Sequence, residues 1–117
     1  MLVSTASAAE PETLTLACQG TTTEEKAKPK PISLGIIINF TAGTVEGFNP
    51  PAKINHFDQV TISFDATREQ RGNQFFVAGS IDRVTGDANA LSISELVGGR
   101  TIFKEYALKC RPAQRMF

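Results

Sequence analysis

Apolar and polar residues alternate with a two-residue period along most of the 117-residue chain. In the clearest segment every second residue is large and apolar: Ile32, Leu34, Ile36, Ile38 and Phe40. Such alternation is typical of a β-strand that buries one face. No stretch of ten or more residues has the 3.6-residue period of an amphipathic helix. The pattern therefore predicts an all-β protein.

Seven segments have this strand character, each bounded by polar residues, glycine or proline: 13–19, 32–40, 45–48, 57–65, 74–83, 87–96 and 101–110. The run Asn49-Pro50-Pro51 ends the short third segment, because proline cannot donate a hydrogen bond to a neighbouring strand. We expect about seven antiparallel strands in a meander, closed as a small or partly open barrel. A two-layer β-sandwich is the alternative.

The last three predicted strands have connections that suggest their register. A three-residue loop, 84–86, with Gly86 in the left-handed conformation, would join the fifth strand to the sixth. It sets Arg83 opposite Asp87 and places the large apolar residues of both strands mostly on one face. Gly98-Gly99 suits a two-residue turn into the last strand, which would set Leu91 opposite Tyr106. In this register the three strands contribute to one core.

Two parts of the chain lack strand character. Residues 20–31 are charged and proline-rich, and we interpret them as a mobile loop. Residues 1–9 are apolar and then small, with Ala6-x-Ala8 matching the small residues that signal peptidase accepts. We interpret 1–9 as the remnant of a signal peptide and 10–117 as a single β domain; an Ala/Ser-rich tail is the alternative. A signal peptide would direct the protein to the periplasm or the exterior.

The composition narrows the range of partners. Twelve basic and twelve acidic residues give a formal net charge of zero. Nucleic-acid-binding domains normally carry a net basic surface, so we expect no nucleic-acid partner. No apolar run is long enough to cross a bilayer, so we expect no membrane span. A small ligand, a protein partner and a homo-oligomer all stay open.

The chain has two cysteines, Cys18 and Cys110, and both fall on the predicted inner face of their strands. In a seven-stranded meander the first and last strands run in the same direction, so closure would bring both cysteines to one rim. We therefore expect a disulfide. Two buried thiols, or a metal or redox pair, are the alternatives, but no further ligand cluster and no C-x-x-C motif accompanies them.

Four residues near the predicted last hairpins are candidates for binding. Glu95 and Lys104 would be diagonal neighbours on the face that carries Tyr106. Buried charges must be paired or reach water, so they would form either a salt bridge at the rim or a polar point in a ligand pocket with Tyr106 as its wall. Arg83 beside Asp87 would mainly support a hairpin by cross-strand attraction.

His56 is the only histidine, and it lies in a predicted loop with no G-x-S-x-G motif elsewhere in the chain. We interpret it as a surface residue rather than a catalytic base. No cofactor motif, metal-ligand cluster or catalytic constellation is present in the sequence. We therefore expect a protein that is not an enzyme and that needs no cofactor.

Three motifs carry a resemblance: L-x-L-x-C-x-G at Leu14–Gly20, I-D-R-V-T-G at Ile81–Gly86, and Y-A-L-K-C-R-P at Tyr106–Pro112. Together they resemble a group of small exported proteins of alphaproteobacteria whose function is not known. Members of the group typically carry a full signal peptide, of which this chain would keep only the end. The resemblance implies export and a disulfide but supplies no site.

The function expected from these observations is a non-enzymatic binding or envelope-associated module of the periplasm. A protein that interacts through its exposed strand edges is the second hypothesis. A hydrolase is the third, because nothing in the sequence supplies a nucleophile together with a base.

Overall fold

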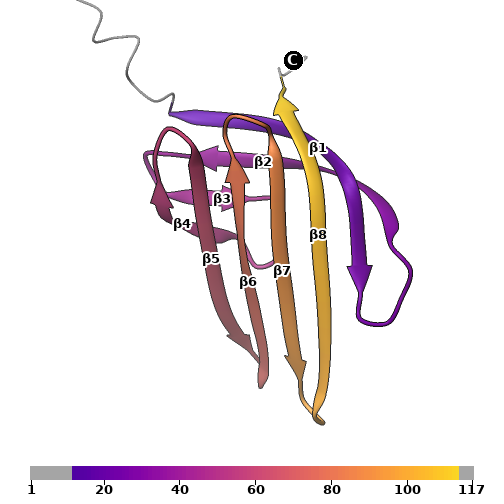
Figure 1. The fold of residues 1–117 in the computed structure, drawn as a ribbon. Coiled ribbons are helices and arrows are strands. Elements are labelled where there is room, and N and C mark those ends of the chain that lie inside the picture. The colour runs from indigo at the N-terminus through magenta and orange to yellow at the C-terminus, as the bar shows by residue number, and fades with distance from the viewer. Residues whose placement is uncertain (1–11, 114–117) are drawn as a thin grey trace, which may run out of the picture.

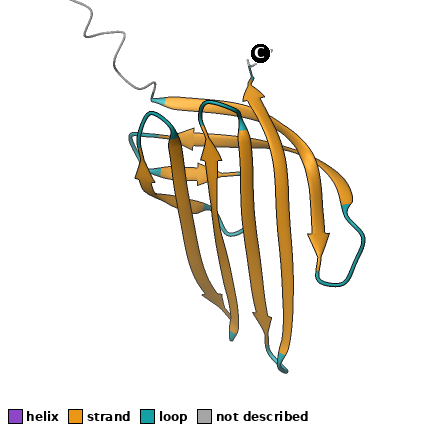
Figure 2. Ribbon diagram, viewed as in Figure 1, coloured by secondary structure: helices purple, strands orange, loops and turns teal. Residues whose placement is uncertain are grey.

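The computed structural model describes residues 12–113, which form eight β-strands and no helix (Figure 2). The strands are β1 (Thr13–Glu24), β2 (Lys30–Asn39), β3 (Thr44–Glu46), β4 (Ala52–Phe57), β5 (Thr61–Gln70), β6 (Asn73–Asp82), β7 (Asp87–Leu96) and β8 (Arg100–Pro112). Each strand pairs antiparallel with the next, and β8 pairs with β1, so the sheet closes into a barrel. The predicted all-β meander is confirmed, as a closed barrel rather than a sandwich.

The one strand that the sequence pattern did not predict is β4. The pattern assigned most of its residues to a loop. Only Ala52 and Ile54 give β4 an apolar face, and its register shifts between Ile54 and His56. Two apolar residues followed by a bulge make an alternating pattern that is too short to be distinguished from a loop.

The predicted loop over residues 20–31 is shorter in the structure, because β1 continues to Glu24 and β2 begins at Lys30. The added part of β1 is threonine-rich, and Thr22 pairs with Lys30 on one side and Tyr106 on the other. Threonine favours strands through its branched side chain. Backbone pairing with two neighbours therefore orders a segment that has no apolar periodicity.

The barrel is closed along only part of its length (Figure 1). Strands β5–β8 run side by side, and β1–β4 lie across their upper part, with the second half of β1 turned down beside β8. β4 pairs with β5 as far as Asp65, and β1 pairs with β8 as far as Lys104. The two hairpin segments at and beyond the ends of these pairs, 67–76 and 92–104, form what we call the extension. Its inner face has no opposing layer of strands.

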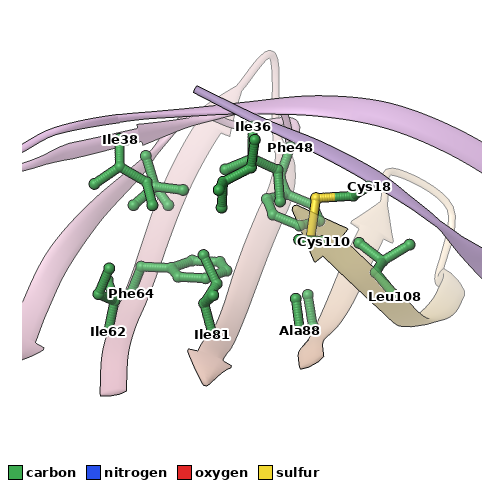
Figure 3. Close-up of a cluster of buried hydrophobic side chains, with 14 of the residues drawn as sticks. Cys18, Ile36, Ile38, Phe48, Ile62, Phe64, Ile81, Ala88, Leu108 and Cys110 are labelled. Carbon is green, nitrogen blue, oxygen red and sulfur yellow. A yellow bond between two sulfur atoms is a disulfide. The ribbon is translucent and has the colours of Figure 1, made fainter. Parts of the chain in front are cut away.

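The core fills the closed part of the barrel (Figure 3). It is built from inward-facing residues of all eight strands, and the largest fully buried side chains are those of Phe64, Ile36, Ile38, Ile62, Val45, Val77 and Cys18. Phe48, from the connection between β3 and β4, packs at the end of the core that faces the extension. Its ring lies 5.4 Å from the ring of Phe64 and 5.4 Å from the ring of Tyr106, measured between centroids. These aromatic contacts close the barrel at that end.

Cys18 and Cys110 form a disulfide, as predicted, and it joins β1 to β8 at the barrel seam (Figure 3). The two residues are directly opposite each other, with their Cα atoms 4.0 Å apart. The first and last strands do not run in the same direction, as was predicted, since an eight-stranded meander makes β1 and β8 antiparallel. The cysteines meet because Cys18 lies in the middle of β1 and Cys110 near the end of β8.

The predicted register of β7 was wrong by one residue against both neighbours. Val77 is opposite Ser92 rather than Ile93, and Tyr106 is opposite Ala90 rather than Leu91. Both turns are one residue longer than predicted. The first covers 83–86 because β6 ends at Asp82, and the second covers 97–99 because Leu96 rather than Val97 pairs with Arg100. Gly86 does adopt the left-handed conformation expected of it, with φ 84°. A shift of one residue reverses which side chains of a strand face inward.

Candidate ligand-binding groove

The inner face of the extension contains a groove of about 230 Å³ directly beyond Phe48. We call it the inner groove, and its lining combines aromatic, hydroxyl, amide and charged side chains: Glu24, Asn49, Phe75, Ser92, Ser94, Ile102, Lys104 and Tyr106. These residues come from β1, β6, β7, β8 and the connection between β3 and β4. The inward alternation of four paired strands brings them together.

Lys104 and Tyr106, both predicted as site residues, lie together in the inner groove. Tyr106 packs edge-on against Phe48, so its ring forms part of the wall between the groove and the core. The Nζ atom of Lys104 lies 3.8 Å from Oε1 of Glu24, and both side chains are about half exposed. A pair this long and this accessible to water contributes little stability.

Arg68 of β5 adds a second cation beside the groove. Its guanidinium carbon lies 5.7 Å from the centroid of the Phe75 ring, and its Nη2 donates a hydrogen bond of 3.4 Å to Oδ1 of Asn49. The first contact is of the cation–π type. Both contacts orient Arg68 towards residues that line the groove.

A second hollow, of about 180 Å³, adjoins the inner groove and shares Glu24 and Lys104 with it. We call it the lysine hollow, and its lining is Thr22, Glu24, Ala27, Lys28, Lys30 and Lys104. Thr22 and Lys30 are cross-strand partners in β1 and β2, and Lys28 comes from the connection between these strands. The two hollows therefore form one polar surface on the inside of the open end.

Glu95 does not belong to this surface, and its predicted proximity to Lys104 was wrong. Glu95 pairs with Gln74 and Thr101 and is exposed on the outer face of β7, whereas Lys104 faces inward. The cause is the one-residue difference in the register of β7 described above. The residues of β7 that face the groove are Ser92 and Ser94.

Arg83 lies at the opposite end of the barrel. It donates a hydrogen bond of 2.6 Å from Nη1 to the carbonyl oxygen of Asp58, and its guanidinium carbon is 5.5 Å from the centroid of the Phe40 ring. Asp87, which the sequence placed opposite Arg83, instead accepts a hydrogen bond of 2.8 Å from Lys109 Nζ. Arg83 thus lines the upper end, where a hollow of about 200 Å³ reaches core residues such as Ile62.

A larger hollow, about 530 Å³, lies on the outer face of β6, β7, β8 and β1. Its side chains are small or uncharged apart from Glu105, and of the four predicted candidates only Tyr106 lines it. Beside it, Phe76, Ile93 and Phe103 form a cross-strand row on the outer surface. Phe103 is 37% exposed. This row is a surface on which a protein could dock.

His56 lies at the surface in β4, with its Nε2 atom 3.2 Å from Oδ2 of Asp58. Backbone N–H groups of Thr61 and Val60 also donate to Asp58, and these bonds, followed by the one to His56, lower the pKa of its carboxyl. The histidine and the aspartate are both more than half exposed. The geometry describes a turn stabilised by a carboxylate.

Sequence reasoning missed most of the groove. Ser92 and Ser94 were placed on the outer face, and Glu24, Lys28 and Lys30 were assigned to a loop. The one available signal is in β7, where Ala88, Ala90, Ser92 and Ser94 are all small. A strand with small residues on one face can pack that face against large aromatic rings, which here are those of Phe64, Phe48 and Tyr106.

No group of three or more potential metal-ligating side chains occurs within residues 12–113. The same range contains no helix long and apolar enough to cross a membrane. Comparison of the chain with protein-family models, curated protein sequences and solved structures finds no match.

Proposed function

We propose that this protein is a non-enzymatic binding module of the periplasm or the exterior, and that it holds a small ligand in the inner groove. One observation carries the proposal: aromatic, hydroxyl, amide and charged side chains converge on one hollow beside the buried core. Small-molecule sites typically combine an apolar or aromatic wall with a few polar groups that fix orientation.

The groove chemistry favours binding over catalysis. Its serine hydroxyls, on Ser92 and Ser94, face Phe75, Ile102 and Lys104. A serine nucleophile needs a base within hydrogen-bond reach. The only histidine of the chain is bonded to Asp58 on the exposed surface of β4, and Lys104, which is opposite Ser92, contacts Glu24 instead. The groove lining therefore suits recognition of a ligand that leaves unchanged.

Export is supported by two independent features. A disulfide such as Cys18–Cys110 forms and persists in oxidising compartments and is rare in the cytosol. The Ala6-x-Ala8 pattern, which lies outside the described residues, matches a signal-peptidase site. The resemblance to small exported alphaproteobacterial proteins agrees with both.

The test is a two-dimensional NMR titration against neutral sugars, sugar phosphates, uronic acids, amino acids and short fatty acids. We expect one class to shift the amide signals of Ser92, Ser94 and Tyr106. The variant Ser94→Tyr fills the groove and should abolish these shifts. Ser33→Tyr makes the same change at an exposed position on the outer face of β2 and should preserve them.

Shifts that persist in Ser94→Tyr would show that the ligand binds elsewhere and would overturn the proposal. Shifts centred on Phe76, Ile93 and Phe103 would instead support a protein that interacts through its outer face. That second function is favoured by the exposed cross-strand row alone, whereas the groove combines several kinds of binding group.

A further inference from the structure

The lysine hollow holds more positive than negative charge. Lys28, Lys30 and Lys104 line it together with a single carboxylate, Glu24. The only ion pair among them is the 3.8 Å contact of Lys104 with Glu24, and within the described chain neither Lys28 nor Lys30 has one. Like charges that face one space repel each other. A bound anion would remove this repulsion.

Thr22 provides a second, independent observation. Its Oγ1 atom is shielded from water and has no hydrogen-bond partner, and it is the one side-chain atom of this kind among the described residues. Thr22 lines the lysine hollow and lies between its cross-strand partners Lys30 and Tyr106. Unpaired polar atoms are uncommon in native proteins and often indicate a missing water, ion or ligand group.

The hollow also adjoins the inner groove, because Glu24 and Lys104 line both. A molecule that lies against Tyr106 in the groove can therefore place one end among the lysines. Lysine ammonium groups and a hydroxyl are the donors that phosphate and carboxylate oxygens accept from.

From this geometry we propose that the ligand of the inner groove carries an oxyanion, a phosphate or a carboxylate, which binds in the lysine hollow to Lys28, Lys30 and Lys104, and to Thr22 once rotation about its Cα–Cβ bond turns the shielded hydroxyl into the hollow. The body of the ligand is a small polar ring, of the size of a monosaccharide, that packs on Tyr106 and Phe75. This inference rests on the proposed function, since it names the ligand class of the same groove.

The test is calorimetric titration of the intact, oxidised protein with four probes: glucose, glucose 6-phosphate, glucuronate and inorganic phosphate. We expect glucose 6-phosphate or glucuronate to bind at least about tenfold more tightly than glucose, because the charged group adds hydrogen bonds to ammonium groups. Raising the salt concentration should weaken the binding of the charged probe and leave the affinity for glucose unchanged. Comparing the two charged sugars separates phosphate from carboxylate, and inorganic phosphate shows whether the anion binds without a ring.

Two variants identify the anion site. Lys28→Gln combined with Lys30→Gln should lower the affinity for the charged probe about tenfold or more. The matched control, Lys26→Gln combined with Lys53→Gln, removes the same charge from positions that do not line the lysine hollow and should keep the affinity within about twofold. Thr22→Val removes the orphaned hydroxyl with almost no change in volume. It should weaken binding while leaving the thermal midpoint unchanged or raised, which a merely structural hydroxyl would not do.

Equal affinity for glucose and the charged sugars, or equal loss in the hollow and control variants, would overturn the oxyanion inference and leave the groove function standing. A charged sugar whose NMR shifts survive Ser94→Tyr would instead overturn the groove function. The two failures are therefore distinguishable.

Discussion

At the turn between β6 and β7, the carboxylate of Asp82 accepts hydrogen bonds from the backbone N–H groups of Val84, at 2.8 Å, and Thr85, at 3.0 Å. The bonds to Thr85 and then Val84 lower the pKa of the Asp82 carboxyl below its ordinary value of 3.8. Asp58 holds the turn before β5 in the same way. Single carboxylates thus set the two connections at the upper end of the barrel.

The lowered pKa of Asp82 leads to a pH-dependent prediction. Because the folded pKa lies below the unfolded one, the stability contributed by the carboxylate is present above the unfolded value and is lost as pH falls through the folded value. Asp82→Asn should therefore be less stable than the wild type near neutral pH, and the difference should shrink as the pH falls below the ordinary pKa of 3.8. Urea unfolding across this range measures it. A difference that stays constant with pH would contradict the argument.

At the scale of single residues, the sequence predicted chemistry better than position. Alternation placed Cys18, Cys110, Lys104 and Tyr106 on the inner face, and the structure confirms all four. Glu95 was misplaced because the face of a residue depends on the register of its strand. Register depends in turn on loop length, and a difference of one residue in a loop is not visible in an alternating pattern.

Among the elements, β6 and β7 show most clearly why close packing fixes this register. Gly79 of β6 lies against the ring of Phe64. A Cβ atom added at Gly79 would be 2.7 Å from Cζ of Phe64 and 2.5 Å from the carbonyl oxygen of Asn89. Ala90, directly opposite Gly79, is also small. The large ring of β5 therefore requires small residues on the facing strands.

Gly79→Ala should consequently destabilise the fold, by about 1–3 kcal/mol, because overpacking forces neighbouring side chains and backbone to move. The measurement is the free energy of unfolding in urea. Gly98→Ala is the spatial control, since nothing lies within 4 Å of a Cβ at that position, although its φ of 100° adds backbone strain of its own. A variant at Gly79 as stable as the wild type would show that the contact with Phe64 is not tight.

The sequence predicted seven of the eight strands. The strand that it did not predict, β4, shows which kind of element an alternating pattern cannot reveal. β2 and β5 have long alternating segments that only a half-buried strand produces. β4 has two inward residues and a bulge, and its pairing with β5 is a tertiary effect. The threonine-rich end of β1 is ordered for the same reason. A strand that is ordered by pairing with its neighbours, rather than by its own apolar alternation, cannot be predicted from the sequence alone.

For the whole molecule, the disulfide determines how firmly the barrel is closed. Cys18 and Cys110 are separated by 92 residues and join the first strand to the last. A cross-link over a loop of this length restricts the unfolded chain strongly. Replacing both cysteines by alanine should lower the free energy of unfolding by about 2–5 kcal/mol.

Urea titration of the double variant beside the oxidised and reduced wild type measures this contribution. The free energy of unfolding of the reduced wild type should be close to that of the variant and lower than that of the oxidised wild type. Equal stability of the oxidised protein and the variant would contradict a role of the bridge in closure.

The groove follows from an architecture in which β1–β4 cross only the upper part of β5–β8. β5–β8 extend beyond β1–β4, so inward-facing residues near Phe48 are covered by core while those of the extension face water (Figure 1). Inward alternation alone does not distinguish the two regions. The sequence could therefore predict that Lys104 and Tyr106 share a face, but not that this face is open at their position.

The most direct test of the central claim, that the inner groove holds a small ligand, is native mass spectrometry of the oxidised protein recovered from a bacterial periplasm. The wild type and Ser33→Tyr should each carry an additional small-molecule mass that is absent from Ser94→Tyr. An additional mass that is also retained by Ser94→Tyr, or a wild type with the mass of the polypeptide alone, would contradict the account.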